Sequence, residues 1–340
     1  MLNLKNVDQI FLSIGSGTMT DLVRFISYHN RSPFISLPTA PSVDAYASSG
    51  SALTIGRFKY HIDLHAPIAI FANLGILCAS PRPMIASGFG DMFGKFTAVE
   101  DWKLAHLILN EPYDDLIANR SWRAVQDCVR RARILGENWE EDIRVLISAL
   151  IESGLCMRDA GHSRPASGSE HHLSHFWEMK LLREGRPTII HGVKVGIATL
   201  YASKYYELIK QTDQDHAISL LNKSRKPDPE AEIHTINSVY GQIAGQIKEA
   251  QAPPLNMTDE TFEQIKTRII TYWGEIQKIA ATVPSSIVIK NLLSIVEAPT
   301  EPISAGLTLE NVIEALAYAH YIRPSFTVIK LCYILGMKIN

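Results

Sequence analysis

Hydrophobic positions along the chain follow two patterns, and the change between them falls near residue 80. Before it, short apolar runs rich in β-branched residues are separated by turn-forming segments, which is typical of buried strands. These runs lie at 10–14, 33–39, 52–62 and 67–72, and the third alternates as a hairpin does. A helical period follows the first run at 20–30. The pattern predicts an α/β unit over residues 1–80.

After that point helical periodicity dominates, and proline-rich breakers such as QAPPLN (251–256) interrupt it. The predicted helical stretches are 83–109, 121–134, 138–154, 168–184, 192–211, 230–248, 258–281, 284–296, 308–320 and 324–336. We therefore expect a larger, all-helical part over residues 81–340. A cleft is expected between the two parts.

Composition narrows the class of protein. The chain has 340 residues, 46% of them hydrophobic, which is ample for a core. A net charge of −2 and the lack of a basic run interleaved with aromatics give no attraction to nucleic acid or anionic membranes. Four scattered cysteines without a CxxC pair favour a reducing compartment. The longest apolar run, 66–79, is too short to span a bilayer, and no secretory signal is evident. A soluble cytoplasmic protein is expected.

The stretch SGSEHHLSH carries three histidines, His171, His172 and His175, in a chain with 12. Its first four residues, 167–170, match a capping box and predict that a helix starts there. His171 and His175 are then four residues apart on one helical face, whereas His172 points about 100° away from His171. The pair can bind a metal together, or one can be a ligand and the other a proton carrier. Surface histidines bonded to neighbours remain the alternative.

Two further metal-ligand candidates, Asp91 and His191, stand at the starts of helical runs. One carboxylate and two neutral imidazoles can hold Zn²⁺ or another divalent ion and leave positions open for water or substrate. Asp91 can instead be a first-turn acid at the positive end of a helix dipole. His191 can be a buried histidine bonded to the backbone. The pattern alone does not show that the three residues converge.

Two loops follow predicted strands. GSGTMTD (15–21) lies between a strand and a helix, where glycines let backbone N–H groups approach a pyrophosphate, although a plain turn explains it equally well. PTAPSVDAYAS (38–48) follows a buried strand, and ligands gather at strand ends in open α/β sheets. Asp44 in this loop is either a ligand-binding acid or a turn former.

Together, GSGTMTDL, PTAPSVDAYAS, ASGFGDMFGKFTAVEDWKLAH, SRPASGSEHHLSH and HGVKVG resemble the metal-dependent polyol dehydrogenases. This family includes glycerol dehydrogenases, iron-containing alcohol dehydrogenases and dehydroquinate synthases. SRPASGSEH is the most specific stretch, and it resembles the branch of bacterial glycerol-1-phosphate dehydrogenases. The dehydroquinate synthase branch resembles it much less. The resemblance implies a dehydroquinate synthase-like fold, in which 1–80 is part of a Rossmann-like dinucleotide-binding domain and 81–340 is the metal and substrate domain.

Position by position, the resemblance implies Asp91, His171 and His191 as metal ligands. Zinc is expected, with nickel or iron as alternatives. Asp44, Asp91 and His175 would contact the substrate and carry catalysis. The residues implied to line NAD(H) or NADP(H) are Gly17, Thr18, Met19, Thr20, Asp21, Thr39, Ala40, Pro41, Ser42 and Ser48.

The implied reaction is reduction of dihydroxyacetone phosphate to sn-glycerol 1-phosphate by NAD(P)H, and its reverse. The metal would act as a Lewis acid on the C2 oxygen, and His175 would help to move a proton. Arg164 is the first candidate to bind the phosphate and Lys194 the second, although both can be surface charges. The family implies a homodimer.

Two alternatives remain open, and the first of them comes from a departure from the family. Family members carry several dozen residues before the glycine loop, which begins here at residue 15, so the first strands of the cofactor domain are expected to be missing. The chain can then be a catalytically impaired homologue that acts as a binding or assembly partner. It can also be a dehydrogenase for glycerol or another small polyol.

Overall fold

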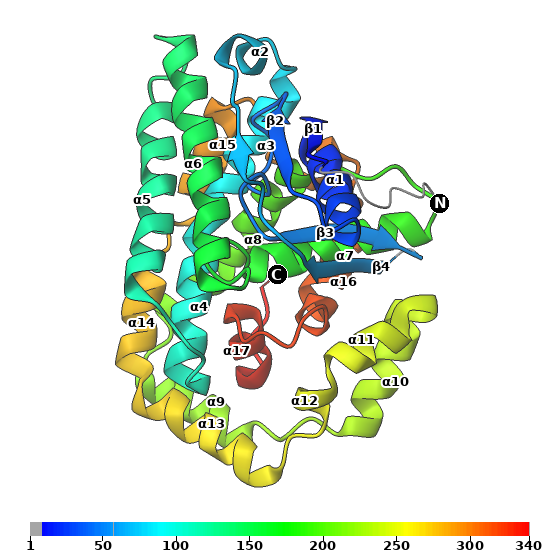
Figure 1. Cartoon of the computed structure of the whole chain (residues 1–340). Coiled ribbons are helices and arrows are strands. Elements are labelled where there is room, and N and C mark those ends of the chain that lie inside the picture. Colours follow the sequence, from blue (N-terminus) through cyan, green and yellow to red (C-terminus); the bar gives the residue numbers. More distant parts are fainter. Residues whose placement is uncertain (1–8, 57, 340) are drawn as a thin grey trace.

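The computed structural model describes residues 9–56 and 58–339. Figure 1 shows a small α/β part, in blue, against a larger body of helices, as the sequence predicts. The yellow helices toward the bottom of the view extend away from the α/β part.

A three-stranded parallel sheet in the order β1-β2-β5 forms the centre of the α/β part. Its strands are β1 (Phe11–Gly15), β2 (Phe34–Pro38) and β5 (Ala69–Ile70), and helix α1 (Gly17–His29) follows β1 through the glycine loop. The predicted strands at 10–14 and 33–39 are confirmed, and the one at 67–72 is shorter than expected. The carboxyl ends of β1 and β2 therefore lie side by side, where ligands bind in such sheets.

The predicted hairpin is also confirmed. Strands β3 (Gly50–Ile55) and β4 (Phe58–Asp63) pair antiparallel, with Gly50 opposite Asp63. Lys59 of β4 forms an ion pair with Glu178 of the helical body at 3.0 Å. The hairpin thus connects the α/β part to the helical body.

Most predicted helices are present with small shifts in their ends, but the predicted stretches 230–248 and 258–281 are each divided into two helices. The helices are α2 (Leu74–Cys78), α3 (Arg82–Phe93), α4 (Lys95–Leu109), α5 (Asp115–Ala132), α6 (Trp139–Ala160), α7 (Ser169–Arg183), α8 (His191–Gln211), α9 (Gln214–Lys223), α10 (Pro229–Tyr240), α11 (Ala244–Ala250), α12 (Ala252–Leu255), α13 (Asp259–Thr271), α14 (Trp273–Thr282), α15 (Ser286–Ile295), α16 (Leu309–Tyr318) and α17 (Val328–Leu335). Three short 3₁₀ turns among the described residues are η1 (Gly241–Ile243), η2 (Pro302–Ala305) and η3 (Ala319–Tyr321). Helix α8 is central, because α3, α7, α14, α15 and α17 all pack against it.

Several predictions about the helices need correction. The stretch 83–109 is two helices rather than one, because α3 ends and α4 begins at Gly94. A side chain at Gly94 would meet Val195 of α8 at 2.9 Å, so this position must stay small. Helices α2, α9 and the four-residue α12 were not predicted, and α12 lies in the stretch QAPPLN that was expected to be a breaker. Helices α2 and α9 each begin at a polar cap, Asn73 and Asp213 respectively. By length and composition Trp273–Ile295 could cross a membrane, but it is divided into α14 and α15.

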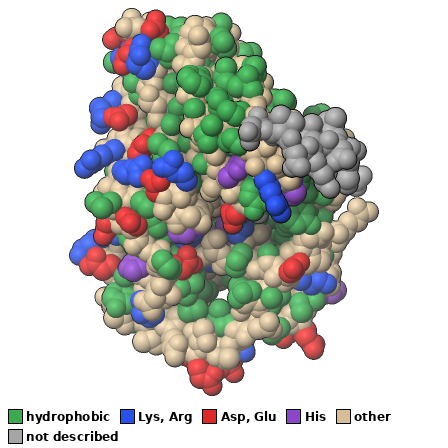
Figure 2. Space-filling model, in the orientation of Figure 1, with side chains coloured by type: hydrophobic (Ala, Val, Ile, Leu, Met, Phe, Trp, Pro, Cys, Tyr) green, Lys and Arg blue, Asp and Glu red, His purple; other side chains and the backbone are tan. Residues whose placement is uncertain are grey.

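Part of the α/β surface is apolar. Ile10, Leu12 and Ile14 of the β1 region are exposed, as are Ile68 and Phe71 around β5. Figure 2 shows hydrophobic side chains gathered in the upper part of the visible face, where Figure 1 places β2 and α2. The helical body leaves these side chains uncovered.

Glycines at the crossing of α3 and α8 let the two helices approach each other at backbone distance. A methyl group at Gly90 would lie 2.3 Å from the carbonyl oxygen of Gly192, and one at Gly192 would lie 1.8 Å from that of Ser87. Such contacts are too short for any side chain. Asp91 and His191 are the direct chain neighbours of these glycines, so the crossing places them next to each other.

Replacing Gly192 by Ala should therefore force α3 and α8 apart. We expect Gly192→Ala to lower the free energy of unfolding by about 1–3 kcal/mol or more, the usual cost of overpacking. Urea unfolding monitored by circular dichroism measures this. The matched control is Gly245→Ala in α11, where an added methyl group meets nothing within 4 Å. The control should be neutral or slightly stabilising, and equal effects of the two variants would contradict the role given to the crossing.

Candidate metal centre and substrate cavity

Three side chains proposed as metal ligands come together from three helices. Asp91 lies near the end of α3, His171 in the first turn of α7, and His191 is the first residue of α8. Their ligating atoms all lie within 4.8 Å of one another, and His171 Nε2 is 4.0 Å from Asp91 Oδ1. One carboxylate and two imidazoles at this spacing can hold a divalent ion and leave coordination positions open.

A buried carboxylate orients the imidazole of His171. Glu170 Oε1 accepts hydrogen bonds from His171 Nδ1 at 2.7 Å and from the backbone N–H of Gly168 at 2.7 Å. Because Nδ1 carries the proton, the lone pair of Nε2 faces Asp91, as metal ligation requires. His191 is also in the ligating form, because burial, followed by the charge of His171, lowers its pKa well below the ordinary value.

The predicted capping box is only half correct. Helix α7 begins at Ser169 with Gly168 as its N-cap, and Glu170 reaches back to the Gly168 N–H as expected. Ser167, however, does not cap the helix. Its hydroxyl lies 3.3 Å from a guanidinium nitrogen of Arg323.

Lys95 joins the proposed substrate residue Asp44 to Asp91. Its ammonium is fully buried and lies 2.8 Å from Asp44 Oδ2 and 2.9 Å from Asp91 Oδ1. The Asp44 N–H donates to Asp91 Oδ2 at 3.0 Å. Burial, followed by the charge of Asp91, raises the pKa of Asp44. Each oxygen of Asp91 accepts one protein hydrogen bond and keeps a second lone pair, so Lys95 and a metal ion fit at the same carboxylate.

Lys95 was missed in the sequence. The available signal was its position four residues after Asp91, which places the two side chains on one helical face.

His175 follows His171 by one helical turn. Its Nδ1 lies 3.5 Å from Glu178 Oε2, and its Nε2 lies 3.5 Å from Arg323 Nη2. Arginine can only donate, so Nε2 is the acceptor and the proton sits on Nδ1. Burial lowers the pKa of His175 well below its usual value, although the hydrogen bond with Glu178 raises it. Neutral His175 is thus fixed in one tautomer beside the triad.

Glu178 and Lys194 form an ion pair inside the protein. The Lys194 ammonium lies 2.7 Å from Glu178 Oε2 and is nearly fully buried. Burial by itself would raise the pKa of Glu178, but the charges of Lys194 and Lys59 and the hydrogen bond with His175 hold it well below its usual range. Lys194, the second phosphate candidate, therefore neutralises a buried carboxylate.

A cavity of about 420 Å³ opens between the α/β part and the helical body. The proposed residues that line it are Gly17, Thr18, Asp21, Asp44, Ser48, His171, His175 and His191. Lys59 and Arg323 also line it. In Figure 2, histidine, acidic and basic side chains adjoin one another below the apolar patch. The cavity thus connects the glycine loop with the triad.

Other proposed dinucleotide residues lie outside that lining. Met19 is exposed on α1, Thr20 donates its hydroxyl to the carbonyl of Ser16, and Ser42 bonds to the Tyr46 hydroxyl. Thr39, Ala40 and Pro41 follow β2 and are not among the described residues that line the cavity. The carbonyl of Ser42 accepts a hydrogen bond from the hydroxyl of Ser87 in α3 at 2.9 Å, and that of Ala40 accepts one from the hydroxyl of Tyr46.

The glycine loop is tight because its neighbours leave no room. A methyl group at Gly17 would lie 2.6 Å from Val43 Cγ2.

Arg24, which was not predicted, is fully buried and bonds to Asp21 Oδ1 and the Gly50 carbonyl, each at 2.7 Å. Burial raises the pKa of Asp21 to about 6. Arg24 thus ties α1 to the start of the hairpin.

Arg164, the first phosphate candidate, lies behind the cavity wall. Its Nη2 donates to the carbonyls of Asp101 at 3.1 Å and Phe326 at 2.9 Å, and its Nε lies 3.2 Å from Glu111 Oε2. Arg323 lines the cavity in its place. No local pattern singles out Arg323, since it lies far along the chain from the histidine motif.

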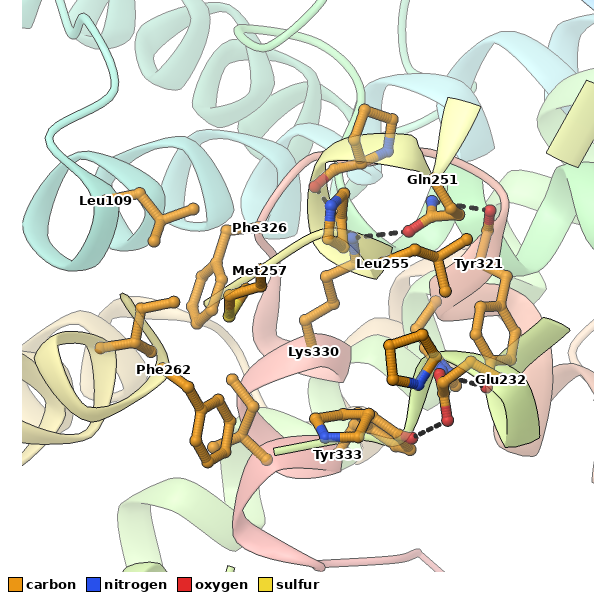
Figure 3. A pocket seen from close by; sticks show the side chains of 17 residues that line it. Leu109, Glu232, Gln251, Leu255, Met257, Phe262, Tyr321, Phe326, Lys330 and Tyr333 are labelled. Atoms are coloured by element: carbon orange, nitrogen blue, oxygen red, sulfur yellow. Dashed lines mark hydrogen bonds between the residues drawn. The ribbon is translucent and has the colours of Figure 1, made fainter. Parts of the chain in front are cut away.

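A second cavity, of about 110 Å³, lies on the other side of the segment 323–326. Figure 3 shows its apolar side chains, including Phe262 and Phe326, around Lys330. Lys330 donates to the Pro324 carbonyl at 2.8 Å, and Glu232 accepts from two tyrosine hydroxyls. Its charged groups are thus bonded within the protein. His171 and His191 line the first cavity instead, and a carboxylate oxygen of Asp91 lies within 4.8 Å of their ligating nitrogens.

Comparison with known proteins gives consistent matches. A family model described as iron-containing alcohol dehydrogenase matches residues 2–81. The chain is 36% identical over 314 residues to a glycerol-1-phosphate dehydrogenase (NAD(P)+) of Geobacillus stearothermophilus, covering 92% of this chain and 69% of that protein. It is 40% identical over 268 residues to one of Halalkalibacterium halodurans, covering 75% of this chain and 67% of that protein.

Solved structures share the fold at low identity. The crystal structure of an iron-containing alcohol dehydrogenase from Corynebacterium glutamicum gives a TM-score of 0.54 at 13% identity, covering 98% of this chain and 74% of that one. A maleylacetate reductase from Agrobacterium tumefaciens gives a TM-score of 0.53 at 12% identity, covering 96% and 75% respectively. These similarities confirm the expected dehydroquinate synthase-like architecture.

If the triad holds a divalent ion, Glu170 should control its affinity. We expect Glu170→Gln to weaken Zn²⁺ binding by about 10–100-fold, because the amide no longer holds the proton on His171 Nδ1 as a carboxylate does. Competition with a chromophoric chelator measures the affinity. Glu184→Gln, at the other end of α7 and partly exposed, is the matched control and should bind Zn²⁺ as the wild type does. Equal affinities for both variants would argue against the orienting role.

Proposed function

The chain belongs to the glycerol-1-phosphate dehydrogenase family, and on that premise we propose that it reduces dihydroxyacetone phosphate to sn-glycerol 1-phosphate with NADH or NADPH and catalyses the reverse oxidation. The observation that carries the proposal is the convergence of Asp91, His171 and His191, two of which, His171 and His191, line a cavity that also reaches the glycine loop. Reduction of a carbonyl needs a polarising ion and a hydride donor at the same substrate. A cavity that extends from the proposed metal ligands to the glycine loop can bring the two together.

The metal and the dinucleotide would supply the chemistry that side chains lack, namely polarisation of the carbonyl and a hydride. Asp91, His171 and His191 would hold the ion, with zinc proposed and nickel or iron as alternatives. Gly17, Thr18 and neighbouring residues of the glycine loop would hold the dinucleotide.

The remaining residues would position the substrate and move the proton. Asp44 would bind a substrate hydroxyl, and Lys95 would keep that carboxylate beside Asp91. His175 is neutral, lines the cavity and contacts both Glu178 and Arg323, so it can belong to the chain that delivers a proton to the substrate oxygen. The hairpin, fastened by the pair between Lys59 and Glu178, would limit the access of water.

The organisation of the protein is also part of the proposal. Residues 1–80 would form the dinucleotide-binding part and residues 81–340 the metal and substrate part. The family relationship supports a soluble cytoplasmic enzyme that works as a homodimer.

The proposal predicts metal-dependent turnover. Purified chain should oxidise NADH or NADPH in the presence of dihydroxyacetone phosphate, lose this activity after treatment with a chelator and regain it with added Zn²⁺ or Ni²⁺. Absorbance at the nicotinamide band follows the reaction. Asp91→Asn should lower kcat by about 100-fold or more, because it weakens the site that holds the ion.

Two results would count against the proposal. A folded, metal-loaded chain without turnover would point to the impaired homologue. Equal kcat/KM for dihydroxyacetone and its phosphate would point to a dehydrogenase for unphosphorylated polyols.

A further inference from the structure

Arg323 brings a positive charge to the substrate cavity without a carboxylate to balance it. It lies between η3 and α17 and is half-buried. Its hydrogen bonds run to the hydroxyls of Ser163 and Ser167, each at 3.3 Å, and to His175 Nε2 at 3.5 Å. No ion pair to Arg323 is found within residues 9–56 and 58–339. Lys59, the other cation of the lining, is paired with Glu178.

Two further cations lie close behind Arg323, and both bond to the segment that carries it. Lys330 donates to the carbonyl of Pro324, and Arg164 donates to the carbonyl of Phe326. Glu111 is the carboxylate that pairs with Arg164. Arg323, Arg164 and Lys330 therefore lie together at one end of the cavity. Among the described residues, only Arg164 of these three forms an ion pair with an acid.

The shifted pKa values agree with an excess of positive charge there. Burial lowers the pKa of Lys330 to about 7, and the repulsion of Arg164 adds to this while the charge of Glu111 opposes it. Burial also lowers the pKa of Arg323, and the charge of Arg164 adds to the effect while Glu170 opposes it. A bound anion would relieve both costs, since it supplies the missing negative charge.

The groups around Arg323 suit a tetrahedral anion. A guanidinium can donate two parallel hydrogen bonds to phosphate oxygens, and serine hydroxyls can rotate to donate further ones. The hydroxyl of Ser167 is free to do so because it does not cap α7. Pro324 restricts the backbone of Arg323 to extended conformations, which helps to fix the direction of its side chain.

The position of Arg323 next to His175 also suits a small phosphorylated substrate. His175 stands between Arg323 and the proposed metal ligands, with its ring centre 5.7 Å from that of His171 and 6.1 Å from that of His191. In a triose phosphate the phosphorus is only a few bonds from the reacting carbonyl carbon. Both groups can then be bound at once, one on each side of His175.

We propose that Arg323, Ser163 and Ser167 form the anion subsite that binds the phosphate group of the substrate, and that Arg164 and Lys330 position it by holding the backbone of 323–326. This inference rests on the proposed function for the identity of the substrate, but the anion site itself does not. It assigns to Arg323 the role that the sequence suggested for Arg164.

The first experiment measures binding of inorganic phosphate to the metal-loaded full chain by isothermal titration calorimetry, without turnover. Arg323→Met should weaken binding at least about 10-fold, the usual effect of losing a charged hydrogen bond. Arg120→Met removes the same charge from the distant helix α5, where Arg120 pairs with Glu152 and Asp159, and serves as the control. The control should bind phosphate as the wild type does.

The second experiment compares kcat/KM for dihydroxyacetone phosphate and for dihydroxyacetone. Arg323→Met should reduce the value for the phosphorylated substrate by about 10–100-fold, mainly through KM, and change that for dihydroxyacetone by no more than about 3-fold. Arg323→Lys keeps the charge but not the paired donors, so it should recover part of the loss. If Arg323→Met were inactive because it failed to fold, Arg323→Lys would still test the role of the paired donors.

The outcomes separate this inference from the proposed function. Weaker phosphate binding by Arg323→Met without any wild-type turnover would support the anion subsite and contradict the dehydrogenase activity. Unchanged phosphate binding in folded Arg323→Met would overturn the subsite even if the wild type is active. Equal losses for both substrates would also overturn it, since the residue would then act on something other than the phosphate.

Discussion

The contact between α3 and α8 is the constraint on which the rest of the site depends. Gly90 and Gly192 allow their backbones to meet, and no other residue type fits at that separation. The two flanking side chains, Asp91 and His191, are thereby placed within reach of one ion, and α7 adds His171. The site is thus positioned by regular helices rather than by loops, which gives the ligands little freedom to move apart.

Around this crossing, buried charges occur in paired sets. Lys95 sits between Asp44 and Asp91, and Glu178 forms ion pairs with Lys59 and Lys194. Because removing one member would leave a buried charge uncompensated, these sets hold the loop after β2 and the β3–β4 hairpin in place. Arg323 departs from this pattern, since the described residues provide no acid for it. A cation beside a cavity that has no acidic partner can bind an anionic ligand, whereas the ion-paired lysines stabilise the packing of the protein.

Much of the site followed from local features of the sequence. The strands, the hairpin and the start of α7 came from hydrophobic period and turn residues, and the spacing of His171 and His175 placed both on one face. Resemblance to a known family then supplied Asp91 and His191 as partners. Helix boundaries were less accurate. At Gly94, where α3 gives way to α4, an added methyl group would meet Val195 of α8, so packing against a segment about 100 residues away restricts the residue at this boundary.

By itself, the sequence determined which elements form and which nearby side chains share a face, because these depend on interactions within a few turns of chain. Only the tertiary structure decided that Ser167 turns to Arg323 rather than to its own helix, and that Arg164 bonds to backbone carbonyls. Lys95 likewise bridges two acids, one of them on a distant loop. Such choices depend on which charges are buried together, and burial is set by the packing of segments that lie far apart along the chain.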